Sequence, residues 1–125
     1  MTIKEYLLRL SKENPEAIIV GSLGNINNAL KEIDHPHKIH MRGAMGHTMG
    51  CALGIALNTD KQVIAVVGEG SFLMKMGSMA TLLRFSLPNL RVIILDNGCY
   101  ASCGGQQNYF HATRNLLPFE IIRVQ

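Results

Sequence analysis

Residues 63–76 read VIAVVGEGSFLMKM: an apolar run (63–67), then Gly-Glu-Gly-Ser (68–71), then a segment with helical spacing of apolar residues. The apolar run is continuous and rich in β-branched residues. Such a run is typical of a strand buried on both faces, as in a parallel sheet covered by helices. A second run of the same kind, RVIIL (91–95), leads into DNGCYASCGGQ (96–106). Together the two strands predict an α/β fold: a doubly wound, mostly parallel sheet with helices on both faces.

The rest of the chain continues the alternation of helix and strand. Apolar spacing predicts a first helix within residues 1–16 and further helices over 25–33, 45–57 and 72–85. Shorter strands are predicted at 17–20 and 38–41. The sequence contains no internal repeat and no linker-like stretch, so we expect a single domain over residues 1–125.

The composition argues against several classes of protein. Of the 125 residues, 47% are hydrophobic and 17% are charged, and the net charge is only +3. The Lys and Arg residues are scattered, which does not favour a nucleic-acid-binding surface. No apolar run approaches the roughly 18 residues of a membrane span, and the N-terminus lacks the apolar block of a signal peptide. Three cysteines, an odd number without framework spacing, fit reduced thiols and a cytoplasmic location.

Ligands of doubly wound sheets bind beyond the carboxyl ends of the strands. Here that rule selects the loops 21–25, 42–47, 68–71 and 96–105. The glycines beside Glu69 let a ligand approach the backbone closely, and the start of the following helix suits a phosphate.

Glu69 would repel a phosphate unless a cation lay between them. Mg²⁺ is commonly shared between a carboxylate and substrate phosphates. Asn97 can add a side-chain oxygen, and the Gly98–Cys99 turn can add a backbone carbonyl. The residues themselves therefore predict a metal-bound phosphate at this edge of the sheet.

These motifs resemble a known family. Gly-acid-Gly, followed some two dozen residues later by an Asn that ends an apolar strand, resembles the signature of thiamine diphosphate enzymes. GAMGHTMGCALGIAL (43–57) resembles the Gly-x-Met/Leu-Gly segment of their cofactor domain, and LDNGCYASCGGQ (95–106) is most similar to phosphonopyruvate and sulfopyruvate decarboxylases. The resemblance covers residues 17–106.

The resemblance implies a role for individual residues. The carbonyl of Gly43 would meet the cofactor's amino group, and Met45 would be the wedge under the bent cofactor. Glu69, Asn97 and the carbonyl of Cys99 would bind the metal, and His47 is the candidate catalytic side chain. The full set of implied cofactor-binding residues is Gly24, Asn25, Gly43, Ala44, Met45, Gly46, His47, Gly68, Glu69, Gly70, Ser71, Asn97, Cys99 and Tyr100.

The chain departs from the family pattern in two ways. Glu69 stands where the family normally has Asp, so Ca²⁺ is an alternative to Mg²⁺ because it tolerates more varied ligand geometry. The glutamate that activates the cofactor belongs to another domain of the family, and nothing here resembles that domain. We therefore expect a partner subunit with the pyrimidine-binding domain, a hetero-oligomer that is at least a dimer, and no activity of this chain alone. Residues 107–125 are interpreted as a diverged or truncated end without site residues.

The leading interpretation is the cofactor-binding subunit of a decarboxylase that acts on a small anionic 2-oxo acid. One alternative is a carboligase of the acetolactate synthase type, and another is a non-catalytic domain used for assembly or regulation. A nicotinamide-binding domain is disfavoured because no Gly-x-Gly-x-x-Gly follows the first strand. The segment HPHKIH (35–40) is interpreted as an exposed loop leading into a strand, not as a metal cluster.

Overall fold

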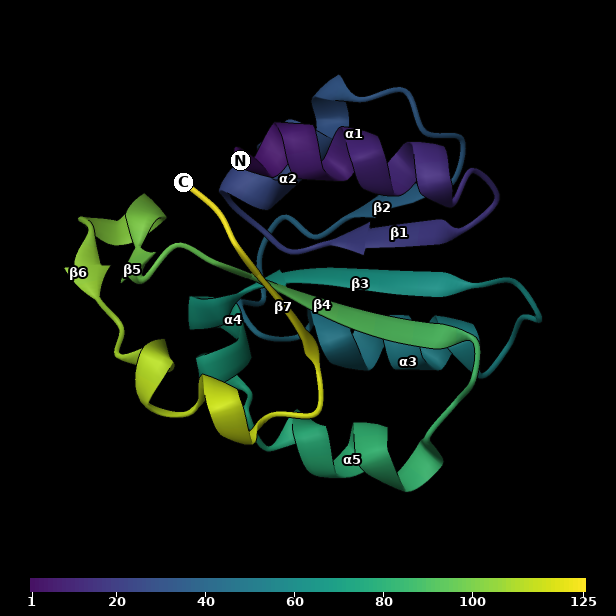
Figure 1. Ribbon diagram of the computed structural model, residues 1–125. Helices are drawn as coiled ribbons and strands as arrows, with labels where there is room; N and C mark the ends of the chain where they lie inside the picture. The colour runs from purple at the N-terminus through teal and green to yellow at the C-terminus, as the bar shows by residue number, and fades with distance from the viewer.

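A five-stranded parallel sheet organises the molecule (Figure 1). The computed structural model describes all residues, 1–125. The strands lie in the order β2-β1-β3-β4-β7, and every neighbouring pair is parallel. Their bounds are β1 (Ile18–Gly21), β2 (Lys38–His40), β3 (Val63–Gly68), β4 (Leu90–Asp96) and β7 (Glu120–Arg123). The predicted α/β fold with a mostly parallel sheet is confirmed.

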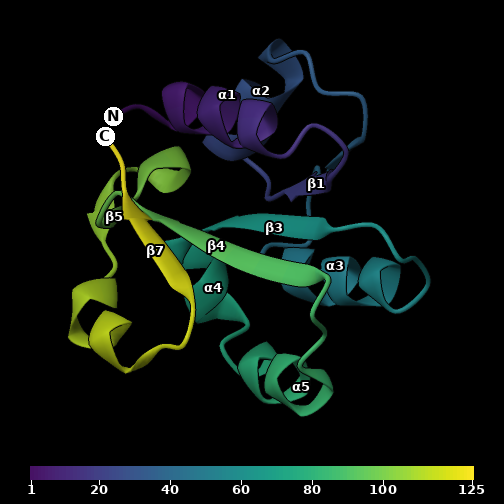
Figure 2. The same ribbon diagram turned by 45° about the vertical axis from the view of Figure 1, so that its right-hand side comes forward.

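Helices cover both faces of the sheet (Figures 1 and 2). On one side lie α1 (Ile3–Glu13) and α2 (Asn25–Glu32). On the other side lie α3 (Thr48–Ala56), α4 (Glu69–Met74) and α5 (Ser78–Phe85). The chain ends meet beside α1, where the amide of Gln125 donates to the carbonyl of Met1 at 3.1 Å.

The two-sided burial explains why the central strands are apolar throughout. Ile64 and Val66 of β3 belong to one hydrophobic cluster, with α1 and α2. Val63, Ala65 and Val67 of the same strand belong to a second cluster, with α3. Because successive side chains of a strand point to opposite faces, a strand between two helical layers needs an apolar residue at every position.

Two of the predicted helices differ from the observed ones. The helix expected over 72–85 is two helices, with a break at Lys75–Gly77. Lys75 leaves the helical conformation (φ −129°, ψ 41°), and Gly77 favours such a break because glycine costs about 1 kcal/mol in a helix interior. The helix expected from residue 45 begins at Thr48, since Ala44 and Gly46 have positive φ values (54° and 90°) and form an irregular turn.

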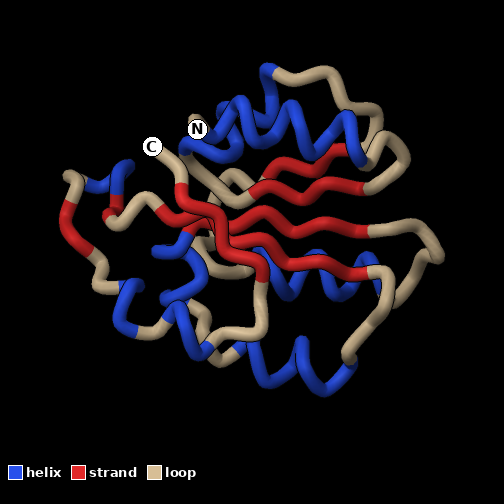
Figure 3. Tube along the Cα trace, viewed as in Figure 1, coloured by secondary structure: helices blue, strands red, loops and turns tan.

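The segment 107–125 contains structure to which the sequence analysis assigned no element. It forms two single-turn 3₁₀ helices (Phe110–Ala112 and Arg114–Leu116) and then β7, which pairs with β4. At its start, β6 (Gln106–Gln107) pairs with β5 (Cys99–Tyr100) in a small antiparallel sheet (Figure 3). The C-terminal segment therefore returns to the main sheet and adds its edge strand.

The segment HPHKIH is less exposed than the sequence suggested. The ring of His35 is buried, and its Nε2 donates to the carbonyl of Ala17 at 2.6 Å. Its Nδ1 lies 2.7 Å from the hydroxyl of Ser11 in α1. The interpretation of His35 as an exposed loop residue was wrong, because this imidazole ties α1 to the chain between α2 and β2. No helix in the structure is long and apolar enough to cross a membrane.

Candidate functional site

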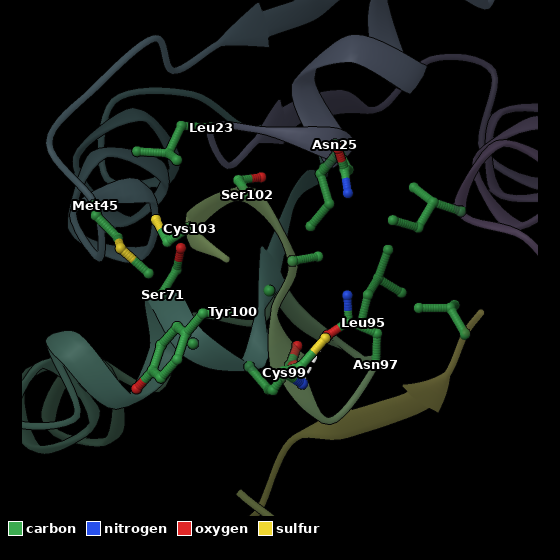
Figure 4. A pocket seen from close by; sticks show the side chains of 17 residues that line it. Leu23, Asn25, Met45, Ser71, Leu95, Asn97, Cys99, Tyr100, Ser102 and Cys103 are labelled. Carbon is green, nitrogen blue, oxygen red and sulfur yellow. Dashed lines mark hydrogen bonds between the residues drawn. The ribbon is translucent and has the colours of Figure 1, made fainter. Parts of the chain in front are cut away.

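A cavity opens beyond the carboxyl ends of β1, β3 and β4, where the sequence predicted a site (Figure 4). Many predicted residues line it together with the apolar side chains of Leu23, Leu95 and Val124. The predicted site residues in the lining are Asn25, Met45, Gly68, Glu69, Gly70, Ser71, Asn97, Cys99 and Tyr100.

The other predicted residues lie outside this lining. Gly24 caps the N-terminus of α2, beside the lining residue Asn25, and has a positive φ of 82°. A Cβ on Gly24 would lie 3.0 Å from the hydroxyl of Ser102. Gly43 and Ala44 are exposed and Gly46 is buried under the side chain of Lys75. His47 is exposed and lines a separate hollow together with Lys75 and Ser78. A catalytic role for His47 stays a prediction.

Glu69 is the only acidic side chain in the cavity lining, and it is 98% buried. Its Oε1 accepts one hydrogen bond from Nδ2 of Asn108 (2.8 Å) and one from the backbone amide of Cys99 (3.1 Å). The other carboxylate oxygen, Oε2, makes no hydrogen bond. Every fully buried side-chain nitrogen or oxygen in the structure does have a hydrogen-bond partner. Oε2 is therefore not fully enclosed, although it has no hydrogen-bond partner in the protein.

Asn97 faces the same point as Glu69. Its Oδ1 accepts from the Cys99 amide at 3.1 Å, so one N–H lies between the two side-chain oxygens. Carboxylate and amide oxygens are the hard ligands that Mg²⁺ and Ca²⁺ prefer. No group of three or more His, Cys, Asp or Glu side chains is arranged around a common point. A cation here would therefore rely on one carboxylate, neutral oxygens, and oxygens from a ligand or water.

Gly70 gives the cavity floor its shape. A Cβ on this residue would lie 2.7 Å from the ring of Tyr100 and 3.5 Å from the methyl group of Met45. A distance below 3.0 Å to a packed ring is a clash, so only glycine permits Tyr100 to lie this close. The hydroxyl of Ser71 is 3.0 Å from that of Ser22, which connects the ends of β3 and β1. The loops after these two strands are thus packed against each other.

Asp96, which the sequence analysis did not select, fixes the turn that carries Asn97 and Cys99. Its side chain is 99% buried; Oδ1 accepts from the amide of Gly98 at 2.9 Å. Oδ2 accepts from Nη1 of Arg123 at 3.0 Å, and Nη1 of Arg114 lies 3.5 Å away. Both arginines lie in the segment 107–125, far from Asp96 in the sequence. No short sequence motif could therefore predict these two ion pairs.

Replacing Asp96 by Ala is expected to lower the free energy of unfolding by about 2–3 kcal/mol, because a buried, doubly paired carboxylate and a turn hydrogen bond are lost. Urea denaturation at pH 7 measures the change. The matched control is Glu120→Ala, which removes the half-exposed ion pair to Arg91 (2.9 Å) and should cost less than about 1 kcal/mol. Equal losses in the two variants would show that Asp96 has no special role.

His40 ends β2 at the same edge of the sheet. Burial, and then the positive charges of Lys38, Lys31 and Arg42, lower the pKa of its imidazole below the usual 6.5. Its Nδ1 lies 2.7 Å from Oδ1 of Asn27 in α2. At neutral pH this ring is therefore uncharged, and the positive charge near the end of β2 comes from its Lys and Arg neighbours.

Comparisons with known proteins identify the family of the chain. Residues 20–122 match the family described as "Thiamine pyrophosphate enzyme, C-terminal TPP binding domain". The match covers most of the chain, so the chain belongs to this family of thiamine pyrophosphate-binding domains. The resemblance predicted from residues 43–57, 68–71 and 95–106 is confirmed.

Curated relatives include decarboxylases. The chain is 32% identical to the sulfopyruvate decarboxylase subunit beta of Methanothermobacter thermautotrophicus, over 95% of this chain and 68% of the relative. It is 35% identical to the subunit of the same name from Methanocaldococcus jannaschii, over 79% of this chain and 53% of the relative. It is 40% identical to the phosphonopyruvate decarboxylase of Streptomyces viridochromogenes, over 81% of this chain and 26% of the relative. The chain thus spans between a quarter and about two thirds of the length of these relatives.

A solved structure shares the fold. The 2-oxoglutarate:ferredoxin oxidoreductase of Magnetococcus marinus superposes with a TM-score of 0.69 at 22% identity, over 85% of this chain and 37% of that chain. At this identity the likeness concerns the fold alone.

Proposed function

We propose that this chain is the thiamine diphosphate-binding subunit of a 2-oxo acid decarboxylase whose substrate is a small anion such as sulfopyruvate or phosphonopyruvate. The observation that carries the proposal is the arrangement at the cavity: Glu69 is its only acidic lining residue, and Oε1 of Glu69 and Oδ1 of Asn97 both accept from the amide of Cys99. The printed names of the relatives support this substrate class.

The residues present fit the cofactor and a divalent cation. Glu69 and Asn97 would hold the cation, which would neutralise the diphosphate, and Gly70 leaves room for the ring of Tyr100 in the cavity lining. When bound, the cofactor's thiazolium ring accepts the electron pair left behind as carbon dioxide departs. Met45, Leu23 and Leu95 give the cavity apolar walls that would exclude water from the reacting atoms.

A partner subunit is part of the proposal. Glu69 is the only carboxylate in the lining, and in this proposal it holds the cation, so the glutamate that activates the cofactor would come from a partner's pyrimidine-binding domain. Two of the relatives above are called subunit beta, which supports a hetero-oligomer. We propose that the assembled enzyme is at least a dimer, located in the cytoplasm, and that this chain alone is inactive.

Calorimetric titration of the chain with thiamine diphosphate tests the proposal. Binding should be roughly tenfold or more tighter with Mg²⁺ than with EDTA, a difference of about 1.4 kcal/mol or more. Adding the complementary subunit should then give release of carbon dioxide from sulfopyruvate or phosphonopyruvate. Condensation of two pyruvate molecules instead would favour the carboligase alternative. Absence of cofactor binding even with the complementary subunit would favour an assembly or regulatory domain.

A further inference from the structure

Asn108 holds the carboxylate of Glu69 from a part of the chain to which the sequence assigned no function. Its Nδ2 donates to Oε1 of Glu69 at 2.8 Å, and the residue is 92% buried. Its own position is fixed by two further bonds. Oδ1 accepts from the amide of Phe110 at 3.1 Å, and its backbone amide donates to the carbonyl of Gly98 at 3.3 Å.

These contacts leave Glu69 with one oxygen for a ligand. Oε1 already accepts from Asn108 and from the Cys99 amide. A carboxylate oxygen with two donors is well satisfied, whereas Oε2 has no hydrogen-bond partner in the protein and is not fully buried. The extra methylene of Glu relative to Asp adds a rotatable bond, and the two hydrogen bonds at Oε1 restrict it.

We infer that Asn108 is a positioning residue that makes Glu69 a one-oxygen ligand and thereby favours Mg²⁺ over Ca²⁺ in the cavity. The inference rests on the proposed function. Mg²⁺ is held by few protein oxygens in strict octahedral geometry, whereas Ca²⁺ accepts more ligands and often takes both oxygens of one carboxylate. Fixing Oε1 on Asn108 removes the two-oxygen mode.

Two variants can separate a role of Asn108 in the local turn from its role in positioning Glu69. The bond from Phe110 to Oδ1 is a turn contact over two residues, which a serine hydroxyl also makes. Serine is too short to reach Glu69 as asparagine does. Asn108→Ser therefore keeps the turn and removes the contact to Glu69. Asn108→Asp is a second variant, because it keeps Oδ1 for Phe110 and replaces the donor by an acceptor.

The experiment measures the affinities for Mg²⁺ and for Ca²⁺ by NMR titration of ¹⁵N-labelled protein, first with each metal alone and then with thiamine diphosphate present. In Asn108→Ser the preference for Mg²⁺ over Ca²⁺ should fall roughly three- to tenfold, about the net effect of one ordinary hydrogen bond. In Asn108→Asp it should fall as well, because the new carboxylate adds a ligand that suits Ca²⁺. The control is Asn58→Ser, which removes an amide bond to the Gly54 carbonyl at the end of α3 and should leave the preference unchanged.

The outcomes distinguish this inference from the proposed function. An unchanged metal preference in both Asn108 variants overturns the inference, and Mg²⁺-dependent cofactor binding would still support the function. A preference that falls in these variants, in a protein that does not bind thiamine diphosphate even with the complementary subunit, supports the inference and overturns the function. If the wild-type chain with the complementary subunit binds neither metal, with or without thiamine diphosphate, both are wrong.

Discussion

Glu69→Gln is expected to weaken Mg²⁺-dependent binding of thiamine diphosphate by roughly a hundredfold, a loss of about 2.7 kcal/mol. The reason is that Glu69 is the only acidic side chain lining the cavity, and removing its charge leaves the cation with only neutral oxygens from the protein. The amide oxygen of glutamine can still accept from Asn108 and from the Cys99 amide, so the packing around the side chain should be preserved. Calorimetric titration in Mg²⁺ and in EDTA measures the loss.

The binding in EDTA is the internal control for this prediction. Glu69→Gln should leave it unchanged or slightly improved, because the repulsion between a carboxylate and the diphosphate disappears. Urea denaturation should give a free energy of unfolding within about 1 kcal/mol of the wild-type value. A variant that folds normally and keeps its full Mg²⁺ dependence would show that the cation binds elsewhere.

The sequence was sufficient to predict those parts of the fold that local patterns determine. Val63–Val67 and Arg91–Leu95 are apolar at successive positions because each strand lies between two helical layers, and that pattern is visible in one short segment. The carboxyl ends of parallel strands meet at one edge of a sheet, so the sequence alone predicts that Glu69 and Asn97 lie close together.

The contacts that fix these residues depend on a segment with no such pattern. Residues 107–119 contain no periodic apolar spacing, yet they carry Asn108 to Glu69 and Arg114 to Asp96. These pairs are separated by 39 residues in the first case and 18 in the second. Pairing across such distances is determined by the packing of the whole domain. The start of α3 shows the same limit, because no apolar pattern predicts the irregular turn at Ala44 and Gly46, which have positive φ values.

Phe72→Ala is expected to lower the free energy of unfolding by about 3–5 kcal/mol, the cost of removing a fully buried phenylalanine. Phe72 has no solvent exposure and lies one turn after Glu69 in α4. Its ring makes edge-to-face contacts with Phe110 (centroids 6.1 Å apart) and with Phe119 (5.8 Å). Because a domain is typically stable by only about 5–15 kcal/mol, the variant should unfold at much lower urea concentration.

The matched control for this prediction is Phe85→Ala at the end of α5. Phe85 is 44% exposed, and its removal should cost less than about 1 kcal/mol. The two phenylalanine contacts also join α4 to the segment that carries Asn108, so amide hydrogen exchange should become faster over residues 108–113 in Phe72→Ala and stay unchanged in Phe85→Ala. Equal stability losses in the two variants would mean that Phe72 does not anchor this segment. Unchanged exchange with a large stability loss would mean that α4 and the C-terminal segment unfold together with the rest of the domain, and that the position of Asn108 depends on the whole core.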